Sequence, residues 1–555
     1  MSTFDLRTQP WILARSLTGD TREYSLLELF SKAHHLDSLV GDLPTQVFAL
    51  HRMLLAILHA ALAPSVPSAN SALTLWNELW QQEALPLDKI EAYLHDPVRD
   101  SRFDLFDAHA PFMQVAGLHT AQDEVSGLKR LIADVPNGSP YFTMRRGSGV
   151  ARISSAEAAR WLVHAHAFDT SGIKSGAVDD IRVKGGKGYP LGTGWAGEIG
   201  GLLAVGKTLR ESLLLNFILV HNDAPVRVGV PVWDRRPLGP GIERLSNDEH
   251  NGDNGRERPD GVADLYTWPG RRIRLIEHEG AVTGVILAYG DPLLPQNAHV
   301  FEPLTTWRHS EPQSKKMGRQ VFMPATHQPD RRLWRGLASL LPNARHSAPS
   351  AWLVEWIGLL ADENALPLTA SFNLRAIGAS YGTQSAVIDE IIDDSITIRA
   401  LLLSARDGSM ADLALDALTT TEEAVTALAR LAGDLEIARG GEPDGARSRA
   451  RENAYFALDP LFRTWISALG TGPTEGTLSS WQSTARRALE EVARDLLAAA
   501  GPSAWVGRHR RTGGHASSSQ AREWFRRSLR SALPGAYRVN KTVSPAVRTE
   551  GVPHD

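Results

Sequence analysis

One stretch decides the fold class: residues 420–439 are TTEEAVTALARLAGDLEIAR. Its apolar residues recur at helical spacing, and Thr420 followed by Glu423 matches the capping box of a helix start. Three more helical patterns follow at 454–469, 478–500 and 518–532, with glycine-containing breaks between them. Four helices joined by short loops predict a four-helix bundle at the end of the chain.

The residues before this helical region have a mixed pattern. Residues 45–62 follow a helical period after Pro44, and 156–167 also predict a helix. Strand-like apolar runs occur at 273–276, 282–287 and 396–401. The expected fold is therefore α+β. We assign a mixed α/β domain to 1–410, the four-helix bundle to 411–540 and a disordered tail to 541–555.

Composition excludes several classes of protein. The chain has 555 residues and no cysteine, so disulfides, cysteine-based zinc sites and thiol nucleophiles are excluded. The N-terminus lacks the basic and apolar regions of a signal peptide. The most apolar run, 53–63, is interrupted by His59 and is too short to span a bilayer. We expect a cytoplasmic protein that makes no membrane contact.

Positive charge is concentrated in two segments. The net charge is −4, yet residues 129–195 hold ten Lys and Arg against five Asp and Glu, and residues 508–548 hold ten against one. Local basic surface on an otherwise acidic chain favours contact with phosphates. Ordinary solvation explains the same counts equally well.

Glycine is unusually dense in residues 171–201, which contain ten. Gly192 to Gly197 matches GxGxxG, but a dinucleotide site needs a buried strand directly before that motif. The preceding Lys-Gly-Gly-Lys-Gly-Tyr-Pro of 184–190 cannot be such a strand. Glycines beside Lys184 and Lys187 instead suit close backbone approach to nucleic acid, with an ordinary glycine-rich loop as the open alternative.

The sequence shows no recognisable catalytic or metal motif. HExxH, GxSxG and a P-loop are all missing, and the pairs His34–His35 and His164–His166 cannot share a metal from one helix face. We therefore expect no catalytic residue, no metal and no cofactor. Gln384, in a turn-like stretch, could donate to and accept from base edges.

The order of several short motifs resembles the CasA family, the large subunits of the type I-E CRISPR Cascade complex. The resemblance covers essentially the whole chain, and Pro111-Phe112-Met113-Gln114 is its most specific motif. The other matching segments are 4–12, Leu43 to Gln46, Tyr141 to Met144, Phe168 to Gly172, the glycine cluster and Leu213 to Asn216.

This resemblance implies a non-catalytic subunit that reads a protospacer-adjacent motif in duplex DNA, mainly through the minor groove. It implies help in unwinding, stabilisation of the R-loop and docking of a helicase-nuclease. The implied partners are double-stranded DNA, the displaced strand, the 5′ handle of the CRISPR RNA and other Cascade subunits. The minor groove carries a degenerate code, so such a reader should tolerate several motifs.

Site residues follow from the same resemblance. The glycine loop corresponds to Gly185, Gly186 and Gly188, and a lysine finger to Lys315 or Lys316. A glutamine wedge corresponds to Gln384, flanked by Thr383 and Ser385, and would help open the duplex by unstacking base pairs. The loop that meets the guide and a neighbouring subunit corresponds to Phe142, Thr143 and Met144.

A basic helix face and two rival functions complete the predictions. Arg522, Arg526, Arg527 and Arg530 could guide the displaced strand, or form a solvated face. Some family members have a cysteine-rich cluster, which this chain lacks. The rivals are a purely architectural subunit of the ribonucleoprotein and a nucleotide-dependent enzyme that uses the glycine-rich segment 185–197.

Overall fold

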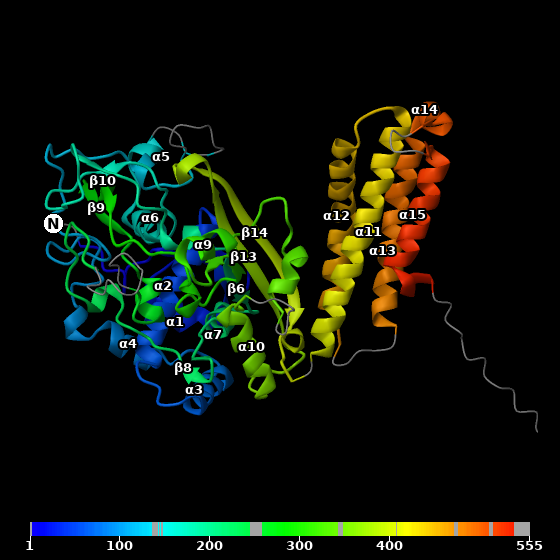
Figure 1. Cartoon of the computed structure of the whole chain (residues 1–555). Coiled ribbons are helices and arrows are strands. Elements are labelled where there is room, and N and C mark those ends of the chain that lie inside the picture. The colour runs from blue at the N-terminus through cyan, green and yellow to red at the C-terminus, as the bar shows by residue number, and fades with distance from the viewer. Residues whose placement is uncertain are drawn as a thin grey trace, which may run out of the picture. The chain divides into compact units, whose positions relative to one another are not determined.

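The chain forms two compact units, Met1–Ala411 (unit 1) and Asp412–Asp555 (unit 2). The structure is a computed structural model (Figure 1). It describes residues 3–135, 143, 145, 148–244, 258–341, 348–406, 408–470, 476–509 and 514–537. The expected tail at 541–555 and most of the polar stretch at 247–261 lie outside these residues.

Unit 1 is built around helix α2 (Pro44–Leu62), which begins with the predicted proline in its first turn. Among the described residues, α2 is the helix with the length and hydropathy that could cross a membrane, but 89% of its most apolar window is buried. Within the core, Arg52 of α2 pairs with Glu302 at 2.9 Å, and the Trp195 indole donates to the same carboxylate. Such burial is that of a core helix.

Several other helices of unit 1 pack against α2, and the Ser25 side chain caps the first helix of the unit by accepting from the Glu28 amide. Helix α6 covers the predicted range 156–167 and packs on α2. Besides α2, the helices described in unit 1 are α1 (Leu26–Lys32), α3 (Ala69–Gln81), α4 (Leu87–Leu94), α5 (Ser148–Ala151), α6 (Ser155–Phe168), α7 (Leu209–Leu215), α8 (Val262–Tyr266), α9 (Glu311–Met317) and α10 (Trp352–Asp362).

All paired strands among the described residues are antiparallel and form small separate sheets. One sheet has the order β2-β1-β3, from Thr21–Tyr24, Ile12–Ser16 and Leu36–Leu39. Another has the order β14-β13-β6, from Ile388–Arg399, Ser371–Tyr381 and Gly201–Val205. The two-stranded sheets are β4–β5 (Lys174–Ser175, Lys187–Gly188), β7–β8 (Val220–His221, Ala224–Pro225), β9–β10 (Arg271–His278, Ala281–Tyr289) and β11–β12 (Trp307–His309, Phe322–Pro324).

The described residues of unit 2 form four long helices, as predicted: α11 (Ser409–Arg439), α12 (Pro443–Ser467), α13 (Thr477–Ala498) and α15 (Ser518–Ala532). Short elements α14 (Gly501–Val506), β15 (Arg508–His509) and β16 (His515–Ala516) lie between the last two. Trp481 of α13 donates to Thr421 of α11 at 2.9 Å and meets Phe462 of α12 edge-on at 5.1 Å. The helices therefore pack around a shared aromatic core.

The predicted capping box at Thr420 was wrong. Helix α11 begins at Ser409, well before Thr420, whose hydroxyl donates to the Asp416 carbonyl at 2.8 Å. A threonine in a helix interior can donate its hydroxyl to the carbonyl four residues earlier. The Thr-x-x-Glu pattern therefore occurs inside helices as well as at their starts. Local pattern located the helix but not its start.

Candidate nucleic-acid interface

Gly185 and Gly186 form the two central positions of a tight turn between Lys184 and Lys187, which we call the glycine turn. Their φ angles are +58° and +72°, and Lys184 and Lys187 exchange backbone hydrogen bonds of 3.1 and 3.2 Å. Two successive positive φ values define a type I′ turn, which glycine adopts without strain. A Cβ at either glycine would meet open space, so the turn is exposed.

Gly188 differs from the other two glycines of the predicted loop. It is buried in strand β5, where a Cβ would approach the Ser175 carbonyl at 3.3 Å. Gly176 is also structural, because its Cβ would lie 2.4 Å from the Gly186 carbonyl oxygen. Only the first two glycines of the predicted set therefore offer free backbone to a ligand.

Gln384 lies at the tip of the long β13–β14 hairpin, within a second turn, Gly382 to Val387, which we call the glutamine turn. Gln384 and its neighbour Ser385 have φ angles of 57° and 54°, which non-glycine residues rarely adopt. Thr383 and Gln384 are exposed, and Gly382 bonds to the Val387 carbonyl at 3.0 Å. Strained residues at an exposed tip are a feature of functional sites.

A single segment, residues 168–175, connects the two turns. The Ser171 amide donates to the Ser385 carbonyl at 2.7 Å, and the hydroxyl of the half-buried Tyr381 donates to the Phe168 carbonyl at 2.8 Å. Burial raises the pKa of Tyr381, which keeps it a neutral donor. At its other end the segment becomes β4, which pairs with the strand that follows the glycine turn. The connecting segment therefore holds both turns in one region of unit 1.

A buried ionic cluster fixes the connecting segment. Asp169 accepts from Lys174 at 2.8 Å and from Arg271 at 2.5 Å, and Arg271 also donates to the Gly192 carbonyl at 3.0 Å. Burial alone would raise the pKa of Asp169, but the two cations outweigh that effect and lower it. Asp169 and Ser171 lie within the segment Phe168 to Gly172 that resembles the family, but their roles depend on Arg271 and Ser385, which are 102 and 214 residues away in the sequence.

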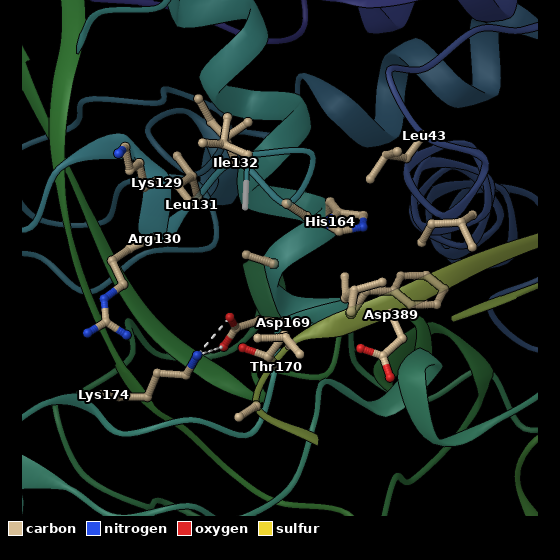
Figure 2. Close-up of a pocket in the computed structure, with 18 residues that line it drawn as sticks. Leu43, Lys129, Arg130, Leu131, Ile132, His164, Asp169, Thr170, Lys174 and Asp389 are labelled. Carbon is tan, nitrogen blue, oxygen red and sulfur yellow. Dashed lines mark hydrogen bonds and ion pairs between the residues drawn. The ribbon is translucent and has the colours of Figure 1, made fainter. Parts of the chain in front are cut away.

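A cavity of about 190 Å³ lies beside this cluster (Figure 2). Its walls combine apolar side chains such as Ile132 and Ile391 with Lys129, Arg130 and the Asp169–Lys174 pair. The last two residues of the glutamine turn, Ala386 and Val387, and the next two, Ile388 and Asp389, form another part of the lining. The cavity thus belongs to the same region as the two turns.

The lysine candidates both lie on the short helix α9. Lys315 forms an exposed ion pair with Glu311 at 2.8 Å, whereas Lys316 is exposed and has no described ion pair. Helix α9 lies in the connection between strand β11 and its antiparallel partner β12. An exposed ion pair is weak, so both lysines can reach a ligand, and Lys316 is the more available.

The predicted guide-contact loop is only partly visible. Phe142 and Met144 lie outside the described residues, while the Thr143 hydroxyl accepts from the Arg145 amide at 3.1 Å. Arg145 pairs with Asp134 at 2.9 Å, with Glu157, and with Asp42 at 3.4 Å. One guanidinium therefore connects this loop to three separate segments of unit 1, a role that the sequence did not reveal.

The predicted basic face in unit 2 is exposed. Helix α15 buries Ala521, Phe525 and Leu529 and leaves the opposite side to solvent. Arg522, Arg526 and Arg530 follow one another at intervals of four residues, so they form one stripe. Arg527 lies beside that stripe, 3.9 Å from Glu523. The helix can present several guanidinium groups to a polyanion.

The glycine-rich segment does not have the geometry of a nucleotide site. The GxGxxG residues lead into a short 3₁₀ helix, Trp195–Glu198, rather than an α-helix. A Cβ at Gly194 would lie 2.4 Å from the Ala167 carbonyl carbon, and one at Gly197 would lie 2.2 Å from the Tyr381 hydroxyl. These glycines permit close packing. Within the described residues no cluster of His, Asp or Glu could hold a metal.

Comparison with known proteins agrees with this architecture. The profile of the family described as CRISPR-associated protein Cse1 matches residues 5–492. A CRISPR-associated protein CasA/Cse1 from Thermus thermophilus is 27% identical over 515 residues, 89% of this chain and 92% of the relative. The crystal structure of Thermobifida fusca Cse1 has 43% identity and a TM-score of 0.85, over 96% of this chain and 98% of that one.

More distant structures share the fold. Cse1 from Acidimicrobium ferrooxidans has 28% identity and a TM-score of 0.79, over 96% of this chain and 99% of that one. A chain from a structure titled CRISPR RNA-guided surveillance complex has 18% identity and a TM-score of 0.66, over 96% of this chain and all of that one. Because the family profile spans most of its length, the chain belongs to the CRISPR-associated protein Cse1 family, the CasA large subunits of type I-E Cascade.

Proposed function

We propose that this subunit of the Cascade surveillance complex reads a protospacer-adjacent motif in duplex DNA and begins strand opening there. The observation that carries the proposal is the connecting segment, which holds an exposed glycine turn and an exposed, strained glutamine turn in one region. Backbone without side chains can enter a narrow groove, and a side chain at a rigid tip can separate stacked bases.

Each predicted group has a distinct task in this proposal. Gly185 and Gly186 approach the groove floor, Gln384 acts as the wedge, and Thr383 and Ser385 support it. Lys316, or Lys315 after loss of its weak ion pair, contacts the duplex from helix α9. A base step costs a few kcal/mol to unstack, which motif binding would offset. Guide pairing then supplies most sequence specificity.

Unit 2 guides the displaced strand in this proposal. The exposed arginines of α15 attract a single strand through its phosphates, which stabilises the R-loop. We further propose that the subunit docks a helicase-nuclease and leaves strand cleavage to that partner. The guide 5′ handle is contacted by the loop that contains Thr143.

A gel-shift titration of the reconstituted guide-RNA complex tests the proposal. Duplexes match the guide and differ only in the flanking motif, and each is titrated with and without this chain. We expect the chain to create motif-dependent affinity. Equal affinity with and without it would support the architectural role instead. Stoichiometric binding of a free nucleotide by the chain alone would support the enzyme.

A further inference from the structure

The β4–β5 ribbon has an outer face that the predicted loop does not include. Lys174 and Gly188 are opposite each other and both buried, so the next pair, Ser175 and Lys187, points outward. Continuing this register by one position places Ile173 opposite Tyr189, on the same outward side as Ser175 and Lys187. Lys184 is opposite Lys187 across the glycine turn and shares its side.

This outer face, Ile173, Lys184, Lys187 and Tyr189, combines exposed apolar and cationic side chains. Ile173 is 46% exposed and Tyr189 is 52% exposed. Both lysines are exposed, and neither has an ion pair among the described residues. One ligand that lies on this face could therefore contact apolar and cationic side chains together.

Neighbouring charges extend the same cationic surface. Arg130 donates to the Ile173 carbonyl at 3.1 Å, so its exposed guanidinium is attached to the ribbon, and Lys129 precedes it. Lys174 itself is buried on the inner side of the ribbon, where it pairs with Asp169 beside the cavity (Figure 2). The carboxylates of the segment 169–190 are otherwise engaged: Asp169 and Asp180 are buried and paired, and only Asp179 is exposed.

We propose that the ribbon face, together with Arg130, is a docking surface for the sugar–phosphate backbone of nucleic acid. Lysine and arginine contact phosphates on both sides of a groove, and Ile173 and Tyr189 pack on the apolar edges of the sugars between them. This inference rests on the proposed function and deepens it. Such contacts position the duplex against the glycine turn without reading its sequence.

The test uses the complete guide-RNA complex and a matched duplex, with affinity measured over a range of salt concentrations. The variants are Lys184→Ala/Lys187→Ala and Tyr189→Ser, with Tyr189→Phe retaining the apolar ring. Lys89→Ala/Lys207→Ala and Phe456→Ser are matched controls, because these side chains are exposed elsewhere. Thermal melting and size exclusion show whether each variant folds and joins the complex.

The double lysine variant should reduce the slope of log K against log salt by about 2, because each phosphate contact contributes about 1. Tyr189→Ser should weaken binding about tenfold with the slope unchanged, Tyr189→Phe should bind normally, and discrimination between flanking motifs should persist throughout. An unchanged slope and affinity would overturn the inference. So would loss of the variants from the complex, since the face would then contact protein.

The same titration separates this inference from the proposed function. If the unmodified complex shows no dependence on the flanking motif, the motif-reading proposal fails whatever the ribbon variants do. If motif dependence is present but the ribbon variants match the controls, only the ribbon inference fails.

Discussion

At the scale of single residues, a position can require glycine for its backbone conformation or for the space that a side chain would fill, and at Gly185 the two can be tested separately. Its φ of +58° demands a residue that tolerates the left-handed region, while the open space around it allows any side chain. Asparagine tolerates that region and is common in type I′ turns, whereas alanine costs about 1 kcal/mol there. The folded turn should therefore survive Gly185→Asn better than Gly185→Ala.

We expect Gly185→Asn to leave the melting temperature of the chain within about 1 °C yet weaken motif-dependent DNA binding at least tenfold, because the new side chain blocks backbone approach. The gel-shift titration measures the second quantity. Gly280→Asn is the matched control, since Gly280 also has a positive φ and open space in a hairpin turn. Normal binding by Gly185→Asn would show that the glycine serves the turn alone.

At Gln384 the backbone favours glycine, because φ is positive, but the position holds a residue with a long side chain. Gln384→Gly relieves the positive φ and should stabilise unit 1 by up to about 1 kcal/mol in denaturant unfolding. The same change removes the wedge, so binding to an intact duplex should fall at least tenfold. A duplex already mismatched beside the motif should restore it, because no unstacking remains to be done.

The comparison of intact and mismatched duplexes is the internal control for that variant. Equal losses on both would mean that Gln384 makes an ordinary contact. The affinity of Gln384→Asn for the intact duplex should lie between those of the unmodified chain and Gln384→Gly. Asparagine keeps an amide and tolerates the backbone angle, but its side chain is shorter.

The resemblance to the Cse1 family indicated which positions were candidates, but not how they meet. Gln384 and the glycine turn come together because Ser171 bonds to Ser385 and β4 pairs with β5. These contacts join residues far apart in sequence, so they cannot be predicted from a local sequence pattern. The burial of Gly188 escaped prediction for the same reason: glycine has no side chain whose polarity could indicate its environment.

At the scale of elements, periodicity predicted long helices well and boundaries poorly. Helix α2 and all four helices of unit 2 were expected, since each buries one apolar stripe at helical spacing. The start of α11 was misplaced, and α9 was missed because it is short, polar and without a buried residue. Short elements depend on the strands around them, here β11 and β12.

Helix α15 supports a prediction that concerns a whole helix face. Arg522→Ala, Arg526→Ala and Arg530→Ala combined should lower affinity for a full duplex target and reduce its salt slope by up to about 3. The effect should vanish with a single-stranded target, which leaves no displaced strand to hold. Affinity measurements on the two targets decide this.

Helix α12 provides the control for those arginines. Arg449 and Arg451 are exposed on the same unit, and their combined replacement by alanine removes two positive charges from another helix, to be compared with Arg522→Ala/Arg526→Ala on α15. If that variant matches the α15 variant, the effect comes from net charge, and α15 has no special role.

At the scale of the whole molecule, the two units differ in their response to acid. Unit 1 buries His51, His59, His164 and His166, and burial lowers their pKa values to about 4, 3, 4 and 4. The histidines described in unit 2, His509 and His515, are exposed. The folded state of unit 1 therefore keeps four imidazoles neutral that the unfolded state protonates.

The direction of the pH effect follows from this difference. Between an unfolded pKa of about 6.5 and the lower folded values, the unfolded chain binds more protons, so stability is lost as pH falls. Each buried histidine contributes up to about 1.4 kcal/mol per pH unit within that window. Hydrogen exchange measured by mass spectrometry from pH 7 to 5 should show unit 1 losing protection while unit 2 keeps it.

The contribution of His59 to this loss of stability at low pH can be tested by itself. Neither of its ring nitrogens has a described hydrogen-bond partner, and its ring lies 4.5 Å from Phe217, so phenylalanine fits the site without leaving a polar atom unpaired. His59→Phe should make unit 1 about 2 kcal/mol less sensitive to the change from pH 7 to 5, because this histidine no longer takes up a proton on unfolding. His278→Phe, at an exposed position, is the control. If both variants show the acid sensitivity of the unmodified chain, burial of His59 does not set the pH response, and the loss must come from other groups in unit 1.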